Sequence, residues 1–276
     1  MGTKGGFDTF TVLEIADVKT GRKRRRGRPE LVRVPVPEGS FFYVLRAPRR
    51  TELSTLFRVA ARCAPDVLTA LPIPAGAGVR PFVPRIFPMH RAAAALCAIL
   101  PQTCLPPQKL SVGVLDPGGA LCGRTDALMP LAADVRIVTD EPQRFDADAL
   151  LARRQFGASL TTGRDAALLA DCDAVICPTP DMAFRHVPVI LSCVPADGAF
   201  SLLPMLLPER YARLCPQSIP PDLFAAALAE KCGVRVPELL ACTGTVFGSA
   251  CANAAQTADL WGEKIAGRRA QGKQVW

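Results

Sequence analysis

The sequence predicts an α/β protein in which a Rossmann-like parallel sheet follows a smaller N-terminal α+β domain. Residues 110–115 form an apolar run typical of a buried strand, and the turn Asp116-Pro-Gly-Gly119 follows directly. Two further apolar runs, 135–138 and 173–177, end in polar residues. The segments between the runs are long enough for crossover connections. This order of strand, turn, helix and strand is typical of a nucleotide-binding domain.

The bulk composition indicates a folded protein rather than a disordered or membrane-spanning one. The chain has 276 residues, of which 49% are hydrophobic and 21% charged, enough for two domains or one large one. No uninterrupted apolar run reaches the roughly 18–20 residues that span a bilayer. The N-terminus lacks the apolar core of a signal peptide. We therefore expect a cytoplasmic protein with no membrane contact.

Eleven cysteines are scattered between Cys63 and Cys251 without a C-x-x-C pair. An odd count and wide spacing do not predict a disulfide framework or a zinc knuckle. The pattern favours buried thiols that pack as small apolar side chains. H-E-x-x-H is also absent, so the sequence predicts no metal site.

The basic character of the chain is local. The net charge is +8, and seven basic residues without an acid lie between Lys19 and Arg28, which leaves +1 for the rest. Apolar alternation on both sides, in residues 8–18 and 30–36, predicts a β-hairpin with a charged tip. Such a tip could hold nucleic acid or an acidic membrane surface. No aromatic residue interleaves the cluster to stack on bases, so we favour a solvated tip without a nucleic-acid partner.

Three domains are expected. Residues 1–107 form an N-terminal α+β domain with the basic hairpin tip, residues 108–248 form the Rossmann-like domain, and residues 249–276 form a C-terminal helix that packs back toward the N-terminal domain. Proline-rich residues 101–107 set the first boundary. Other expected strands are 41–45, 187–192 and 236–242, and other expected helices are 51–61, 89–100, 222–232 and 249–268.

The Gly-Gly turn is the candidate phosphate site. A dinucleotide site needs a tight turn that brings backbone N–H groups and a helix N-terminus against the pyrophosphate. Gly118 and Gly119 allow this close approach, and the helix is expected to begin near Ala120. A strict G-x-G-x-x-G motif would need glycine at positions 116 and 121, where this chain has Asp116 and leucine. The aspartate carboxylate could repel a pyrophosphate, or it could cap the helix.

The end of the second strand is the candidate ribose site. This strand closes on Thr139 and Asp140, and an acid about 20 residues beyond the glycine turn typically binds the ribose 2′-hydroxyl. Asp140 therefore favours NAD. Arg144 keeps NADP open, because an arginine can accommodate the 2′-phosphate.

Three segments, taken in order, resemble shikimate dehydrogenases. Val114-Leu-Asp-Pro-Gly-Gly-Ala120 resembles the family's GAGGA loop, and Asp173-Ala-Val-Ile-Cys-Pro-Thr-Pro180 resembles its D-x-V-I-N-A-T-P strand end. Residues 253–261 resemble the late helix, with Trp261 in the place of the E-L-W tryptophan. The related nucleotide domain of glutamyl-tRNA reductase shares the first two features.

The resemblance implies a two-domain NAD(P)-dependent oxidoreductase acting on a small-molecule substrate. It implies that Gly118 and Gly119 face the pyrophosphate and that Thr179 and Pro180 lie near the nicotinamide. Asn253 stands in the place of a substrate-binding glutamine. The family's catalytic lysine and aspartate have no counterpart that can be assigned in residues 1–107, so no catalytic residue is predicted.

Two functions remain open from the sequence. The first is an oxidoreductase that uses NAD or NADP. The second is a non-catalytic Rossmann-like protein that acts as a nucleotide sensor or a partner-binding module. The aspartate in the glycine loop and the missing proton-transfer pair favour the second. His90 and His186 are the only histidines available for acid–base chemistry near neutral pH.

Overall fold

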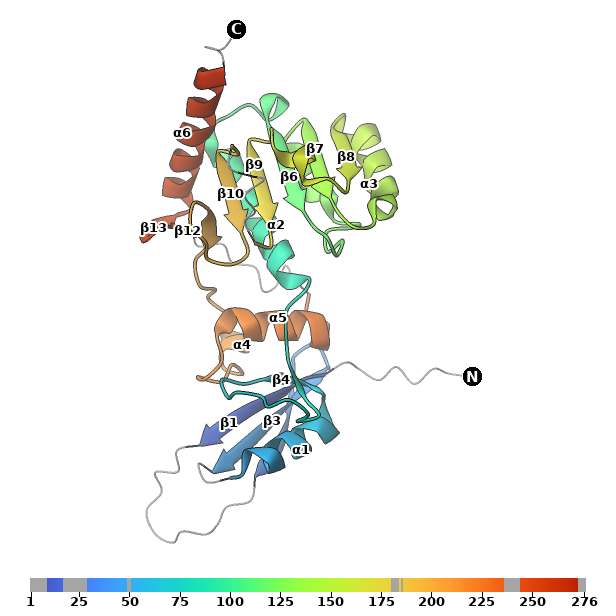
Figure 1. The fold of residues 1–276 in the computed structure, drawn as a ribbon, viewed down its shortest axis with the longest axis vertical. Coiled ribbons are helices and arrows are strands. Elements are labelled where there is room, and N and C mark those ends of the chain that lie inside the picture. The colour runs from blue at the N-terminus through green and yellow to red at the C-terminus, as the bar shows by residue number, and fades with distance from the viewer. Residues whose placement is uncertain are drawn as a thin grey trace. The chain divides into compact units, whose positions relative to one another are not determined.

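The computed structural model of the chain describes residues 9–16, 29–48, 51–179, 184, 186–235 and 244–272. The chain divides into two compact units (Figure 1). Unit 1 contains Met1–Pro84 and Leu206–Leu239, and unit 2 contains Arg85–Met205 and Leu240–Trp276. Unit 1 is thus built from two chain segments that are distant in sequence.

Unit 1 is a five-stranded sheet with a helix on each face. The strand order is β2-β3-β1-β4-β5. On one face, Leu56 and Phe57 of α1 are in the same buried cluster as Leu45. On the other face, the Phe224 ring of α5 meets the Phe42 ring at a centroid distance of 5.4 Å. The elements are β1 (Thr11–Ala16), β2 (Glu30–Pro35), β3 (Phe41–Pro48), α1 (Leu53–Cys63), β4 (Asp66–Leu68), β5 (Arg80–Pro81), α4 (Glu209–Ala212) and α5 (Pro221–Cys232).

The predicted hairpin between the strands that flank the basic segment is wrong. β1 lies between β3 and β4 and is parallel to both, whereas β2 pairs antiparallel with β3. The reason is the short turn after β2. Gly39 adopts a φ of +87°, and the Val36 N–H donates to the Ser40 carbonyl at 2.9 Å, which closes the β2–β3 pair. The predicted tip, residues 17–28, lies outside the described residues.

Unit 2 is built on an eight-stranded sheet of order β13-β12-β11-β10-β9-β6-β7-β8. The six strands from β6 to β11 are parallel. Strands β6 to β8 extend in one direction and β9 to β11 in the other, as in a doubly wound sheet. The elements are β6 (Ser111–Leu115), β7 (Asp134–Val138), β8 (Ser159–Gly163), β9 (Ala174–Cys177), β10 (Val189–Ser192), β11 (Phe200–Leu202), β12 (Gly244–Phe247) and β13 (Ala250–Asn253).

This topology confirms the predicted fold class, a Rossmann-like α/β sheet with a smaller α+β unit. The strands expected at 110–115, 135–138, 173–177 and 187–192 are present, whereas β8 was not anticipated. Its sequence, Ser-Leu-Thr-Thr-Gly, has a single strongly apolar residue, so it gives little alternation. The strand expected at 236–242 lies outside the described residues.

Two helices, α2 (Phe87–Ile99) and α6 (Ala254–Gly272), share the main core of unit 2. Leu96 of α2 and Trp261 of α6 are fully buried there with the β6 residue Val114. The compact unit therefore begins before α2, whereas the sequence suggested a boundary after residue 107. The last helix begins at Ala254 rather than 249, because the β12–β13 hairpin occupies the preceding residues.

The remaining helical segments of unit 2 are short. They are η1 (Leu100–Thr103), η2 (Pro107–Lys109), η3 (Thr125–Ala127), η4 (Met129–Leu131), η5 (Pro142–Phe145), α3 (Asp146–Leu151), the π-helical η6 (Ala152–Phe156) and η7 (Ala166–Leu169). Within the described part of the chain, no helix combines the length and hydropathy needed to cross a membrane.

Candidate functional site

The parallel strands β6, β7 and β9 end at the same carboxyl edge of the unit 2 sheet, where hydrogen bonds join the loops after β6 and β7. The strand order reverses between β6 and β9. In open α/β sheets this switch point is where ligands bind. Most of the predicted site residues lie on these loops, so the candidate site is built from this edge.

The Asp116 side chain accepts hydrogen bonds from the backbone of the turn that follows β6. Its side chain is buried, with 2% exposed. One carboxylate oxygen, Oδ1, accepts the Ala120 N–H at 2.8 Å, and Oδ2 accepts the Leu121 N–H at 2.8 Å. The Asp116 carbonyl also accepts the Gly119 N–H at 3.1 Å. The backbone donors that a pyrophosphate would need therefore already have an acceptor inside the chain.

The helix expected to begin near Ala120 is absent. Turns and the short 3₁₀ segments η3 and η4 occupy residues 120–131. Gly123 adopts a φ of +73° and Pro130 lacks an N–H, so both interrupt helical hydrogen bonding. The buried Asp148 carboxylate holds the interrupted conformation, because it accepts the Gly123 N–H at 3.0 Å and the Thr125 hydroxyl at 2.7 Å. No continuous helix directs its N-terminal dipole at the turn.

Arg144 lies against the Gly-Gly turn. Its Nη1 donates to the Gly118 carbonyl at 3.2 Å and lies 3.6 Å from the Glu141 carboxylate. Gly119 has a φ of +65°, and a Cβ there would lie 2.9 Å from Arg144 Nη1. The backbone conformation therefore favours glycine at 119, and a larger residue there would also make the flexible Arg144 side chain move.

The end of β7 is tied to the same turn. The Asp140 N–H donates to the Pro117 carbonyl at 3.3 Å, and the Thr139 hydroxyl donates to the same oxygen at 3.4 Å. Asp140 is exposed, and its carbonyl accepts Nε–H of Arg164 at 3.2 Å. The structure thus brings Asp116, the glycines, Ala120, Thr139, Asp140 and Arg144 together. Arg164 was missed because it follows the unanticipated strand β8.

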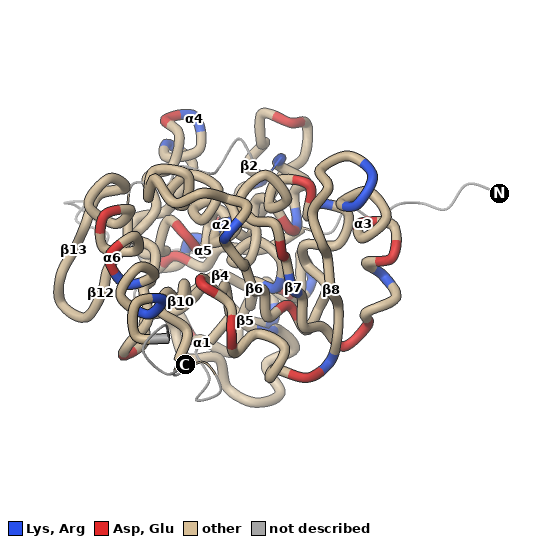
Figure 2. Tube along the Cα trace, turned by 90° about the horizontal axis from the view of Figure 1, so that it is seen from above, with Lys and Arg blue, Asp and Glu red and all other residues tan. Residues whose placement is uncertain are grey.

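Charges of both signs mix around this edge. Figure 2 shows basic and acidic segments interspersed along the chain near β7, β8 and α3, without a continuous basic stripe. Arg144 and Arg164 are held here by hydrogen bonds, and the neighbouring Asp140 and Glu141 are exposed. Electrostatic attraction for a polyphosphate is therefore local to the two arginines.

The residues implied by the family resemblance are less closely grouped. Thr179 is exposed just beyond β9, and Pro180 lies outside the described residues. Asn253 ends β13, five strands from β6 in the sheet order. At about 4.8 Å per strand, this is roughly 24 Å from the Asp116 turn.

The Asn253 side chain forms a capping box at the start of α6. Asn253 Oδ1 accepts the Gln256 N–H at 3.0 Å, and Gln256 Oε1 accepts the Asn253 N–H at 3.1 Å. This reciprocal pair satisfies two helix-end donors. Helix capping therefore explains the position of the Asn253 side chain, and no substrate is needed to explain it.

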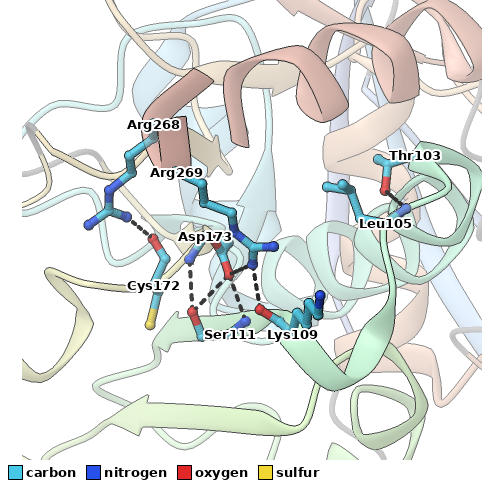
Figure 3. Close-up of polar contacts among 8 residues, drawn as sticks. All are labelled: Thr103, Leu105, Lys109, Ser111, Cys172, Asp173, Arg268 and Arg269. Carbon is cyan, nitrogen blue, oxygen red and sulfur yellow. Dashed lines mark hydrogen bonds and ion pairs between the residues drawn. The ribbon is translucent and has the colours of Figure 1, made fainter. Parts of the chain in front are cut away.

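Asp173, which opens the family-like strand end, anchors α6 to the sheet (Figure 3). Its Oδ2 accepts the Ser111 N–H at 2.9 Å, the Ser111 hydroxyl at 3.1 Å and the Arg269 Nη2–H at 2.8 Å. Arg268 donates to the Cys172 carbonyl at 2.8 Å. These residues lie at the amino ends of β6 and β9, opposite to the candidate site, so their role is structural.

His90, His186 and Cys193 show no sign of activation for acid–base or nucleophilic chemistry. His90 is buried with Nε2 2.7 Å from the Ala120 carbonyl, so it connects α2 to the turn. His186 is exposed. Burial, and to a lesser extent the neighbouring Cys177, raises the pKa of the Cys193 thiol to about 12. A thiol with such a pKa is not a nucleophile near neutral pH.

Unit 1 contains an ionic cluster that the sequence did not reveal. The buried Asp66 carboxylate accepts the Arg80 Nε–H at 2.5 Å and lies 2.7 Å from Lys231 Nζ. A surface cavity of about 380 Å³ adjoins Arg80. Asp66 and Lys231 come from β4 and α5, which are 165 positions apart, so no local pattern could connect them. The cluster ties the two chain segments of unit 1 together.

Comparisons with known proteins show distant structural similarity only. No family profile and no curated protein matches the sequence. A pyrroline-2-carboxylate reductase from Thermococcus litoralis is 15% identical, over 38% of this chain and 36% of that one, with a TM-score of 0.29. A shikimate 5-dehydrogenase from Mycobacterium fortuitum is also 15% identical, over 75% and 63%, with a TM-score of 0.30. A quinate dehydrogenase from Corynebacterium glutamicum, in complex with NAD, is 13% identical, over 97% and 99%, with a TM-score of 0.29.

The chain therefore spans about a third of the length of the first protein and under two thirds of the second. Likeness at this level assigns no activity. The strand order of unit 2 itself defines its fold.

Proposed function

We propose that this chain is a non-catalytic Rossmann-like protein whose phosphate-binding turn is occupied by its own carboxylate. In this function it acts as a weak nucleotide sensor or a partner-binding module rather than as a dehydrogenase. The observation that carries the proposal is the pair of hydrogen bonds from the Ala120 and Leu121 N–H groups to Asp116. The carboxylate takes the backbone contacts that a pyrophosphate makes in a dinucleotide site.

The cost of displacing Asp116 explains why binding would be weak. A hydrogen bond to a charged group contributes about 1.5–3 kcal/mol, so the two contacts together represent roughly 3–6 kcal/mol. A pyrophosphate entering the turn must replace both, and it also brings negative charge toward a carboxylate. The penalty corresponds to roughly a 10²- to 10⁴-fold loss of affinity. The nearby Arg144 guanidinium offsets part of it.

An NAD(P)-dependent oxidoreductase is the second candidate function. The observation in its favour is the exposed Asp140 at the end of β7, which is tied to the glycine turn and available to a ribose hydroxyl. NAD would fit this acid, and NADP would use Arg144. Hydride transfer to a small substrate would then need an acid–base group, and the histidine at the turn, His90, is buried against the Ala120 carbonyl.

A thermal-shift titration with NAD, NADP and their reduced forms distinguishes the two functions. We expect little stabilisation of the wild type at millimolar ligand and a clear ligand-dependent rise in Tm for Asp116→Gly, which empties the turn. Asp116→Asn is the matched control, because its amide oxygen can still cap the turn without the charge. It should respond less than Asp116→Gly.

Saturating stabilisation of the wild type at micromolar cofactor would contradict the proposal and favour the oxidoreductase. An unchanged response in Asp116→Gly would show that the carboxylate is not what keeps the nucleotide out. Because removal of the cap should lower the starting Tm, each variant is compared with its own ligand-free value.

A further inference from the structure

One face of the unit 1 sheet carries an exposed cluster of planar side chains. In a sheet, residues paired in register project to the same face and alternate residues project to opposite faces. Leu45 pairs with Leu31 and packs against α1, which defines the α1 face. Arg33 and Tyr43 pair two positions further along, so they share this face.

The planar groups contact one another. The Arg33 guanidinium carbon lies 3.7 Å from the Phe41 ring centroid, and the Phe41 and Tyr43 rings meet edge to face at 5.3 Å. Arg33 and Leu31 are exposed, and the two rings are partly exposed. β2 has a single neighbour among the described strands, so the cluster lies at the sheet edge. We call Arg33, Phe41 and Tyr43 the stacking cluster.

The helix that packs on the same face of the sheet as the stacking cluster adds positive charge. Helix α1, which packs on this face, contains no acid and exposes Arg58 and Arg62. The acid on β2, Glu30, pairs with Arg46 and projects to the opposite face. The exposed arginines of this strand and helix, Arg33, Arg58 and Arg62, therefore complement a polyanion.

We propose that the stacking cluster and the exposed arginines of α1 form a binding surface for single-stranded nucleic acid. Bases stack on aromatic rings and on guanidinium planes, while basic side chains hold the phosphates. The sequence argued against such a partner because no aromatic residue interleaves the basic segment. Among the described residues, the two rings of β3 provide a stacking platform that this pattern did not reveal. The inference concerns unit 1 alone and does not depend on the proposed function of unit 2.

The experiment is a fluorescence-anisotropy titration of the full chain with fluorescein-labelled U12 at 50 mM salt, with unlabelled polyphosphate as a competitor that lacks bases. Arg33→Lys keeps the charge but removes the planar stacking group. We expect it and Tyr43→Leu each to weaken U12 binding by about fivefold or more, the loss typical of one stacked base. Polyphosphate binding should be unchanged in Arg33→Lys.

Arg46→Lys is the matched control. It makes the same chemical change on the adjacent strand but on the opposite face, where Arg46 pairs with Glu14. It should bind U12 as the wild type does. Equal affinities of Arg33→Lys and the wild type, or equal losses for Arg33→Lys and Arg46→Lys, would overturn the proposal. So would a wild type that does not bind U12, or that binds polyphosphate as tightly as U12.

Discussion

Replacing Asp173 with asparagine tests how the C-terminal helix is attached to the sheet. The change removes the charge that pairs with Arg269 and leaves one oxygen for the three donors that Oδ2 now accepts. Loss of one partner of a buried pair costs about 3–5 kcal/mol. Arg269 is 31% exposed, so solvent screens part of the interaction. We therefore expect a loss of roughly 2–3 kcal/mol in the free energy of unfolding of unit 2.

The assay is urea unfolding followed by tryptophan fluorescence. Trp261 lies on α6 and is fully buried, so its emission reports whether α6 is in place. Asp171→Asn is the control, because Asp171 is 86% exposed and lies 3.6 Å from Arg268. An exposed pair of this kind should contribute less than about 1 kcal/mol. A loss below 0.5 kcal/mol in Asp173→Asn, roughly the scatter of neutral surface changes, or equal losses in both variants, would refute the reasoning.

Two further predictions concern ionisation. Although burial opposes it, hydrogen bonds from Arg80 and Lys231 lower the pKa of Asp66 below its ordinary value of 3.8. The ionised Asp66 carboxylate therefore stabilises the folded state fully at a pH above its ordinary pKa. That stabilisation is lost as the pH falls through the lower pKa of the folded state. Urea midpoints by circular dichroism should thus drop more for the wild type than for Asp66→Asn below about pH 4, and parallel curves would contradict this. Burial raises the pKa of Cys193 to about 12, so iodoacetamide at pH 8 should label the exposed Cys104 and Cys251 well before Cys193. Peptide mapping measures the order of labelling, and labelling of Cys193 first would contradict the prediction.

Local patterns in the sequence were sufficient for the elements with strong periodicity. The apolar residues of β6, β7, β9 and β10 are buried in the sheet interior, so each strand gives a short, strongly apolar segment, which Arg136 interrupts in β7. The helix expected at 222–232 is α5, and Gly233 ends it with a φ of +70°. Strand β8 gave no such pattern because it lies at the sheet edge with Ser159 and Thr161 exposed.

The candidate site was only partly predictable. The glycines, Asp140 and Arg144 were identified by their spacing, and the structure places them around one turn. Whether Asp116 repels a phosphate or caps the turn depends on the positions of the Ala120 and Leu121 N–H groups. Those positions depend on Gly123, Pro130 and the buried Asp148, which is 25 positions further along than Gly123. Spacing alone cannot settle a conformation that contacts across the fold determine.

The sequence by itself determined the α/β fold class, because buried parallel strands appear as apolar segments and the glycine turn appears at a fixed position after one of them. Only the tertiary structure decided which strands pair. β1 and β2 are neighbours in sequence, yet β3 lies between them, because a short turn joins β2 to β3 and β1 gains two parallel partners. The same pairing brings Arg33 beside Phe41 and Tyr43. Strand pairing depends on burial and turn geometry across the whole unit, so no single segment of the sequence determines it.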